Sequence, residues 1–272
     1  MSTLSHSGLH RLPIGAACGA TDLGLRDSNE DNFLIDEALG LAMVADGMGG
    51  HESGEVASAG VLNALRDYLR EHHAVWLAQP DGAPDPDATW SDPAVHAIGL
   101  LYDAIDFANH SLYVQNQARG CADGGGMGTT LTGFWCGPGD TPLVYFHVGD
   151  SRLYRQRDGQ LEQLTRDQTM YQQALDSGMI EHLPPRNLLL QAVGPSPLVT
   201  PEVHAQLVQA GDVLMLCSDG LHGSVPHGEM ESVLAGVSQT TLAPACARLI
   251  AMAKDYGGRD NITVLLALCK ER

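Results

Sequence analysis

Acidic residues recur in four short motifs of this sequence, each at the edge of an apolar, strand-like segment. The motifs occupy residues 26–32 (RDSNEDN), 46–51 (DGMGGH), 218–220 (SDG) and 260–263 (DNIT). Carboxylate oxygens are hard ligands, which suit Mg²⁺ or Mn²⁺. Two such ions held about 3.5–4 Å apart activate a water for attack on a phosphoryl group. The motifs therefore predict a two-metal hydrolytic site, provided that the fold brings them together.

Asp46 shows most clearly why a bound cation is the favoured interpretation. The apolar run 41–45 (LAMVA) ends directly at Asp46, and an ionised aspartate beside a core is costly unless it is paired or metal-bound. Gly47 then lets the backbone turn sharply and approach a ligand closely. A single Asp-Gly after a strand is more often a plain turn. The metal prediction therefore depends on the whole set, which is Glu30, Asp46, Asp219 and Asp260.

Short strands near both ends of the chain must position these acids, with helices between them. Apolar, β-prone runs punctuated by Gly or Asp predict strands at residues 14–20, 33–36, 41–45, 129–135, 143–148, 213–217 and 262–268. Apolar residues at helical spacing predict helices around residues 57–69, 98–112 and 242–253. Strands, then helices, then strands again indicate an α+β fold rather than a βαβ alternation.

Length and charge limit the classes of protein to which the chain belongs. It has 272 residues, of which 44% are hydrophobic and 18% charged, and this is typical of a globular protein with a sizeable core. The formal net charge of −18 argues against nonspecific binding to nucleic acid or to an anionic membrane. We interpret residues 1–272 as one domain with a core at about 14–268, because the acidic motifs lie on both sides of segment 79–93. That segment is rich in Pro and Asp, and we expect a surface loop there.

The cysteines and the hydropathy pattern indicate a cytoplasmic protein. The six cysteines form no CxxC pair and no His cluster accompanies them, so a zinc site is not expected. Cys217 and Cys269 lie in apolar runs and are typical of buried, reduced thiols, which persist in a reducing compartment. No run approaches 18 apolar residues, so we expect no membrane span.

In their residues and their order, the four motifs resemble those of the metal-dependent Ser/Thr protein phosphatases, the type 2C or PPM family, in its bacterial form. Two further motifs of that family match, GTT at residues 128–130 and GDSR at residues 149–152. The resemblance extends from about residue 14 to residue 268. It implies a four-layer αββα sandwich, in which two antiparallel sheets carry helices on both outer faces. It also implies an enzyme that releases phosphate from phosphoserine and phosphothreonine.

The resemblance assigns metal-binding roles to the acids. It implies that Asp46 bridges two Mn²⁺ or Mg²⁺ ions. Glu30 and the carbonyl of Gly47 would complete the protein ligands of one ion, and Asp219 and Asp260 those of the other. A water between two divalent ions loses its proton far more easily than bulk water. It would attack the phosphorus in line, without a covalent enzyme intermediate.

The same resemblance implies supporting roles for four more residues. Arg26 stands where the family has its phosphate-binding arginine, and a guanidinium grips two phosphate oxygens at once. Asp31 and Asn261 resemble residues that orient ligands and waters. Asp150 of the GDSR motif corresponds to an acid that bacterial members link to a third, weaker ion, which it shares with the equivalent of Asp219.

Two departures from the family pattern concern proton transfer and substrate handling. Met48 stands where eukaryotic relatives often have a His proposed to protonate the leaving oxygen, although bacterial relatives share the Met. The general acid stays open between His51 and a metal-bound water, with the water the simpler donor. Gln168 stands where the family usually has His. It lies at the start of segment 167–194, which resembles the mobile flap beside the active site, so we expect altered substrate handling.

Two other functions stay open on the sequence alone. A catalytically silent member would serve as a binding module, but such a chain should lack one or more metal acids, and all are present here. A phosphoesterase of small molecules is poorly separated from a protein phosphatase by these motifs. The expected partners are phosphorylated proteins, including a Ser/Thr kinase or its substrates, and the acidic surface favours basic phosphopeptides. We expect the chain to be a monomer.

Overall fold

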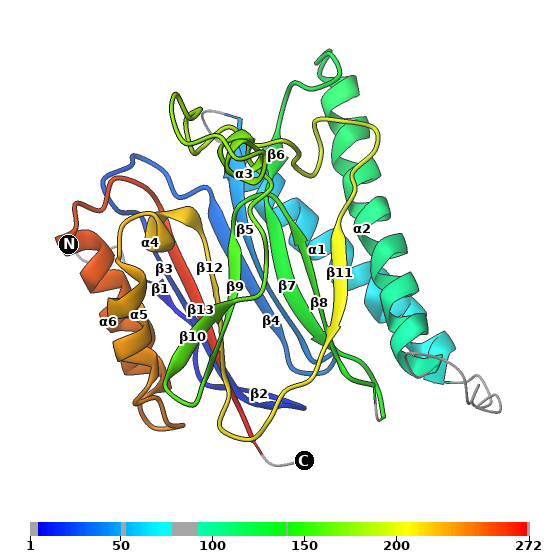
Figure 1. Ribbon diagram of the computed structural model, residues 1–272. Coiled ribbons are helices and arrows are strands. Elements are labelled where there is room, and N and C mark those ends of the chain that lie inside the picture. Colours follow the sequence, from blue (N-terminus) through cyan, green and yellow to red (C-terminus); the bar gives the residue numbers. More distant parts are fainter. Residues whose placement is uncertain (1–4, 50–52, 78–91, 140, 271–272) are drawn as a thin grey trace.

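Two antiparallel sheets lie face to face between helices in the computed structural model, which describes residues 5–49, 53–77, 92–139 and 141–270 (Figure 1). The first sheet has the order β1–β3–β13–β12–β9–β10, with β2 also paired to β3. Its strands are β1 Ser5–His6, β2 His10–Leu12, β3 Gly15–Asp22, β9 Arg152–Arg157, β10 Gln160–Gln163, β12 Val213–Cys217 and β13 Ile262–Cys269.

The second sheet has the order β11–β8–β7–β5–β4, with β6 also paired to β5. Its strands are β4 Asp31–Asp36, β5 Leu41–Met48, β6 Gly128–Thr129, β7 Leu131–Cys136, β8 Leu143–Val148 and β11 Glu202–Gln206. The helices are α1 Ser53–Leu77, α2 Asp92–Ala118, α3 Met170–Asp176, α4 Asp219–His222, α5 His227–Leu234 and α6 Leu242–Asp255. None of these described helices combines the length and the apolar composition that a membrane span needs.

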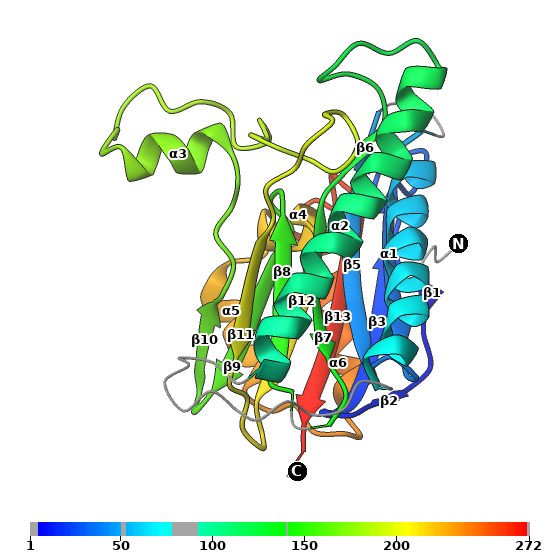
Figure 2. The same ribbon diagram turned by 90° about the vertical axis from the view of Figure 1, so that its right-hand side faces the viewer.

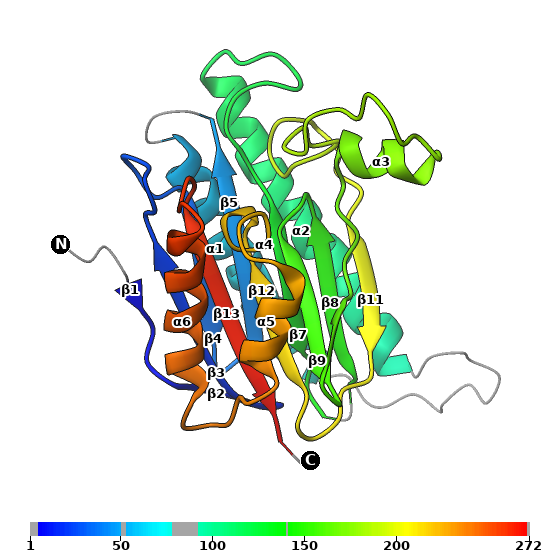
Figure 3. The same ribbon diagram turned by 60° about the vertical axis from the view of Figure 1, so that its left-hand side comes forward.

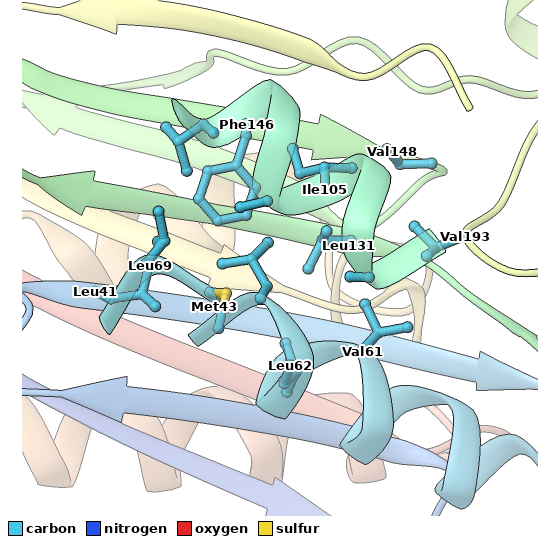
Figure 4. Packing of buried hydrophobic residues seen from close by; sticks show 14 of the residues in the cluster. Leu41, Met43, Val61, Leu62, Leu69, Ile105, Leu131, Phe146, Val148 and Val193 are labelled. Carbon is cyan, nitrogen blue, oxygen red and sulfur yellow. The ribbon is translucent and has the colours of Figure 1, made fainter. Parts of the chain in front are cut away.

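Three apolar layers hold the sandwich together. The helices α1 and α2 cover the outer face of the second sheet, and α5 and α6 cover that of the first (Figures 2 and 3). A third layer fills the space between the sheets, with Phe134, Leu216 and Leu265 among its members. Figure 4 shows the layer under α1 and α2, built from Leu41, Met43, Val61, Leu62, Leu69, Ile105, Leu131, Phe146, Val148 and Val193.

The predicted α+β fold and its layered sandwich are confirmed, and most predicted strands form within a few residues of their expected ends. The predicted run 129–135 is divided, because Thr129 ends β6 and Leu131 begins β7. Strands β1, β2, β9, β10 and β11 and the short helices α3, α4 and α5 were not predicted. The surface loop predicted at residues 79–93 lies almost wholly outside the described residues.

One buried histidine ties the second sheet to the segment that follows β10. The side chain of His147 lies between the sheets, with Nδ1 2.8 Å from the Thr132 hydroxyl and Nε2 3.0 Å from the Arg166 carbonyl. Because a carbonyl only accepts, Nε2 carries the proton of the neutral ring, and Nδ1 faces the Thr132 hydroxyl. Burial lowers the pKa of His147 to about 4. The folded protein therefore holds this ring neutral.

We predict that replacing His147 with Gln flattens the loss of stability in acid. The folded-state pKa lies below the unfolded value of 6.5. The neutral ring therefore contributes fully to the free energy of unfolding above that value, and this contribution is lost as the pH falls towards 4. The lost stability is at most about 3 kcal/mol. Urea unfolding between about pH 7 and about pH 4.5 measures it. Carboxylates titrate in both proteins, so the effect of His147 is the difference between their slopes of unfolding free energy against pH. Equal slopes for wild type and variant would contradict the prediction.

Candidate metal centre

Strand alternation directs the acids of the first two motifs into the space between the sheets. Ala42 and Val44 of β5 belong to the layer between the sheets. Because side chains alternate along a strand, Asp46 faces the same way at the end of β5. Asp31, the first residue of β4, is the cross-strand partner of Asp46. Two carboxylates thus meet at one end of the sandwich.

The turn after Asp46 has room only for glycine. A Cβ on Gly47 would lie 2.1 Å from the Gly54 carbonyl and 2.7 Å from that of Glu30. Thr130 fixes the strand end, since its hydroxyl accepts from the Asp46 N–H at 2.9 Å and its own N–H donates to the Asp46 carbonyl at 2.9 Å. The local backbone is therefore set before any ligand is considered.

Ser218 joins the first sheet to the acids of the second. Its hydroxyl donates to Asp31 Oδ2 at 2.6 Å and accepts from the Thr263 N–H at 3.0 Å. The residue after Ser218 is Asp219, which begins α4. The strand β12 thus delivers Asp219 to the same end of the sandwich as Asp31 and Asp46.

Asn261 holds together the two loops that carry Glu30 and Asp260. Its Oδ1 accepts from the Glu30 N–H at 2.8 Å, and its Nδ2 donates to the carbonyls of Leu23 and Ser28 at 3.0 and 2.9 Å. Arg26, in the same loop, donates from Nη2 to Asp260 Oδ2 at 2.7 Å. Both side chains of this ion pair are more than a third exposed, so the pair adds little stability.

The side chain of Glu30 packs against the beginning of α1. A Cβ on Gly54 would lie 2.3 Å from Glu30 Oε2, so the absence of a side chain at Gly54 makes room for the carboxylate. The hydroxyl of Ser58, one turn further along α1, donates to the Glu30 carbonyl at 2.6 Å. The sequence contained no distinct signal for either contact.

Asp150 lies in the turn that leads from β8 of the second sheet to β9 of the first. Gly149 makes this turn possible with a φ of +103°, in the left-handed region that favours glycine. On the far side of Asp150, the Nε2 of His222 lies 2.9 Å from the Asp150 carbonyl. Burial lowers the pKa of His222 to about 4, and the nearby Arg152 guanidinium acts in the same direction.

Burial and mutual repulsion raise the pKa values of the acids. Burial first, and then the charges of Asp31, Asp219, Asp150 and Asp260, hold the pKa of Asp46 well above its usual range. Burial likewise raises the pKa of Asp31 to about 7 and that of Asp150 to about 7. The pKa of Asp219 is raised by burial and by Asp260, against an opposing hydrogen bond with Asp46. Such an arrangement has a strong electrostatic preference for cations.

The clustered carboxylate oxygens are the ligands that hard cations prefer, although they do not yet surround a common point. Asp219 Oδ1 is buried without a hydrogen-bond partner among the described residues, so one ligand oxygen is left over for an ion. Across the described ranges, no three His, Cys, Asp or Glu side chains surround a common point closely enough to ligate one ion as they stand. One physical reason is that Arg26 Nη2 occupies Asp260 Oδ2 at 2.7 Å.

The segment 167–194 leaves the body of the protein beside this centre and carries α3, which projects away from the sheets (Figure 2). Its base is anchored by Asp167, which accepts two hydrogen bonds of 2.7 Å from Arg152. Gln168 is buried, and its Oε1 accepts from the Gly149 N–H at 2.9 Å. The unusual glutamine therefore fastens the segment to the GDSR turn.

The structure brings Asp31, Asp150, Asp219 and Asp260 within electrostatic reach of Asp46. Met48 lies at the end of β5 and has no proton to donate. His51, considered as the acid, falls outside the described residues. The supporting contacts of Ser58, Ser218 and His222 were not predicted. Only Ser218 had a signal, because it stands inside the SDG motif.

Comparisons with known proteins agree with this fold and site. The family model for protein phosphatase 2C matches residues 18–267. A curated relative, the serine/threonine phosphatase stp of Listeria monocytogenes, is 35% identical over 255 residues, which cover 90% of this chain and 92% of that protein. The chain therefore belongs to the protein phosphatase 2C family.

Solved structures of similar proteins lead to the same family. The Mycobacterium tuberculosis serine/threonine phosphatase PstP/Ppp is 31% identical, with a TM-score of 0.75 and coverage of 98% of this chain and 99% of that one. The catalytic domain of PstP in complex with two manganese ions is also 31% identical, with a TM-score of 0.73 and full coverage of both chains.

We predict that Arg26→Ala does not weaken Mn²⁺ binding, because Arg26 competes with cations for Asp260. Calorimetric Mn²⁺ affinity should stay equal to that of wild type or rise, while the KM for a phosphopeptide should rise, as expected for the loss of a phosphate-binding arginine. The matched control is Arg66→Ala, which removes the same charge from an ion pair with Asp67 on α1. A large loss of Mn²⁺ affinity would instead make Arg26 a structural support of the metal ligands.

Proposed function

We propose that this chain hydrolyses phosphoserine and phosphothreonine in proteins, with two divalent ions held by Glu30, Asp46, Asp219, Asp260 and the Gly47 carbonyl. The observation that carries the proposal is the convergence of Asp46, Asp219 and Asp260 from both sheets on one end of the sandwich, where repulsion and burial raise the pKa values of Asp46 and Asp219. Family membership and the two manganese ions of the PstP catalytic domain support it. The chain is a metal-dependent protein phosphatase, and its cofactors are two Mn²⁺ or Mg²⁺ ions.

When bound, the two ions supply positive charge and acidify the water that attacks the phosphorus. The residues of the chain do the rest. Asp46, central among the acids, would contact both ions. Arg26 is exposed and donates one hydrogen bond to Asp260, so its guanidinium can turn to a phosphate and bind two of its oxygens. Asp31, through Ser218, and Asn261, through the Glu30 N–H, hold the ligand loops in place.

Two further assignments belong to this proposal. Asp150 and Asp219 would share a third, weaker ion, since their charges repel and both the Asp150 side chain and Asp219 Oδ1 are buried. Leaving-group protonation would fall to water rather than to a side chain, because Met48 carries no transferable proton. A selective effect of His51→Gln on a phosphopeptide, with none on an aryl phosphate, would reverse that assignment.

We infer the partners of the chain from its net charge and its location from its cysteines. With a net charge of −18, the protein attracts basic phosphopeptides more strongly than acidic ones. We assign it to signalling, acting on a Ser/Thr kinase or on the substrates of one, as a monomer. A cytoplasmic location is supported by the cysteines of the described residues, which are all free thiols.

The proposed function is tested by phosphate release from matched phosphothreonine, phosphoserine and phosphotyrosine peptides. EDTA treatment should abolish release from the first two, and Mn²⁺ or Mg²⁺ should restore it, because the acids act through the ions. Small phosphate esters and a phosphotyrosine peptide serve as comparison substrates. Full activity in metal-free protein would exclude this mechanism. A clear preference for small esters would favour the phosphoesterase alternative.

A second prediction concerns Asp46. Asp46→Asn should lower kcat by more than about 100-fold, comparable to the loss of a major electrostatic contribution, and should weaken both Mn²⁺ sites. The metal-free variant should unfold at the same or a higher temperature than wild type, because the amide relieves repulsion among buried acids. Asp158→Asn, which removes the same charge from the exposed β9–β10 turn, is the control. Near-normal turnover with unchanged Mn²⁺ binding would reduce Asp46 to a turn residue.

A further inference from the structure

His222 lies close to the proposed metal centre, although it belongs to none of the four acidic motifs and is not a proposed metal ligand. It is the last residue of α4, a single turn that begins with Asp219 directly after β12. Residues three apart lie on the same side of a helical turn. The Gly223 N–H donates to the Asp219 carbonyl at 2.7 Å and closes this turn. The position of His222 is thus rigidly linked to that of Asp219.

The ring of His222 makes a directed contact with the backbone of Asp150. Its Nε2 lies 2.9 Å from the Asp150 carbonyl oxygen, and a carbonyl only accepts, so Nε2 is the protonated nitrogen. Asp150 lies between β8 and β9, outside the regular hydrogen bonds of either sheet. On its other side, the flanking Gly149 is held by Gln168 through bonds of 2.9 and 2.7 Å. His222 is therefore the link from this turn to α4.

That link joins two carboxylates that oppose each other electrostatically. Asp150 comes from the turn between the two sheets, and Asp219 from the end of β12 in the first sheet. Each bears a negative charge in its ionised form, and the two groups repel across the centre. Without a tie between their backbones, repulsion favours a wider separation of the carboxylates. The His222 bond acts against that separation.

We propose that His222 is a positioning residue, which holds Asp150 in register with Asp219 so that both carboxylates reach one divalent cation. This inference rests on the proposed function, in which Asp150 and Asp219 share the weaker ion. His222 itself touches neither the ion nor the phosphate. Its contribution is the N–H that it donates, and any side chain that places a donor at the same distance from the backbone should replace it.

The test compares side chains that keep or remove this donor. The Nε2 of glutamine lies as many bonds from Cα as that of histidine, so His222→Gln keeps the donor. His222→Phe keeps the ring shape without the donor, and His222→Asn has a donor one bond too short. His227→Phe is the control, because His227 on α5 makes a similar 2.9 Å contact with the Leu161 carbonyl outside this centre. Mn²⁺ binding is measured by calorimetry in the absence of substrate, with circular dichroism to check folding.

His222→Phe and His222→Asn should weaken the weakest Mn²⁺ binding event by about tenfold or more, as loss of a ligand-orienting partner does. The tighter events should change little. His222→Gln and His227→Phe should bind like wild type, and kcat of the two weakened variants should recover at high Mn²⁺. If His222→Phe fails to fold, the Gln and Asn variants carry the comparison alone.

Identical Mn²⁺ binding in the Gln and Asn variants would overturn the role of His222 while leaving the proposed function intact. The proposed function fails separately if wild type neither binds Mn²⁺ nor releases phosphate. Equal weakening in all three His222 variants would also overturn the inference, because the hydrogen bond would then not be the cause.

Discussion

The fold concentrates negative charge at one end of the space between its two sheets, and the other polar contacts there respond to that constraint. Asp46 and Asp31 face each other across β5 and β4, and Asp219 and Asp260 approach from the first sheet. Burial and repulsion both raise the pKa of Asp46. Only a strong compensating interaction makes such a group stable in its ionised form, and divalent cations supply the largest available one.

Most polar contacts around the acids fix the positions of the strand ends and loops, and they do not neutralise the carboxylate charges. Thr130 fixes both the N–H and the carbonyl side of the Asp46 strand end, Ser218 ties the two sheets together at Asp31, and Asn261 bonds three backbone groups across two loops. Arg26 is the exception, since it pairs directly with Asp260. A scaffold that sets ligand positions in this way reduces the reorganisation needed when cations bind. Below these contacts, a layer of apolar side chains that includes Val44, Phe134 and Leu216 fills much of the space between the sheets.

The sequence was most informative where a chemical motif coincided with the end of an apolar strand. Asp46, Asp219 and Asp260 could be selected because each stands beside a run such as 41–45 or 213–217. Strand β9 was missed because its sequence, RLYRQR, is dominated by polar residues, and the ion pair between Arg157 and Asp212 requires the fold. Thr130, Ser218 and His222 could not be assigned, since their partners lie up to 187 residues away and depend on how the two sheets face each other. Gln168 was recognised as unusual, but its bond to Gly149 required the fold.

The positions of bound ions in a crystal grown with Mn²⁺ show directly whether these acids hold two cations. Anomalous scattering from manganese locates the ions independently of the protein atoms. We predict two strong peaks about 3.5–4 Å apart, with the carboxylate of Asp46 between them, Asp260 released from Arg26, and Asp219 Oδ1 bound to an ion. A single peak, or two peaks that do not share Asp46, would contradict it.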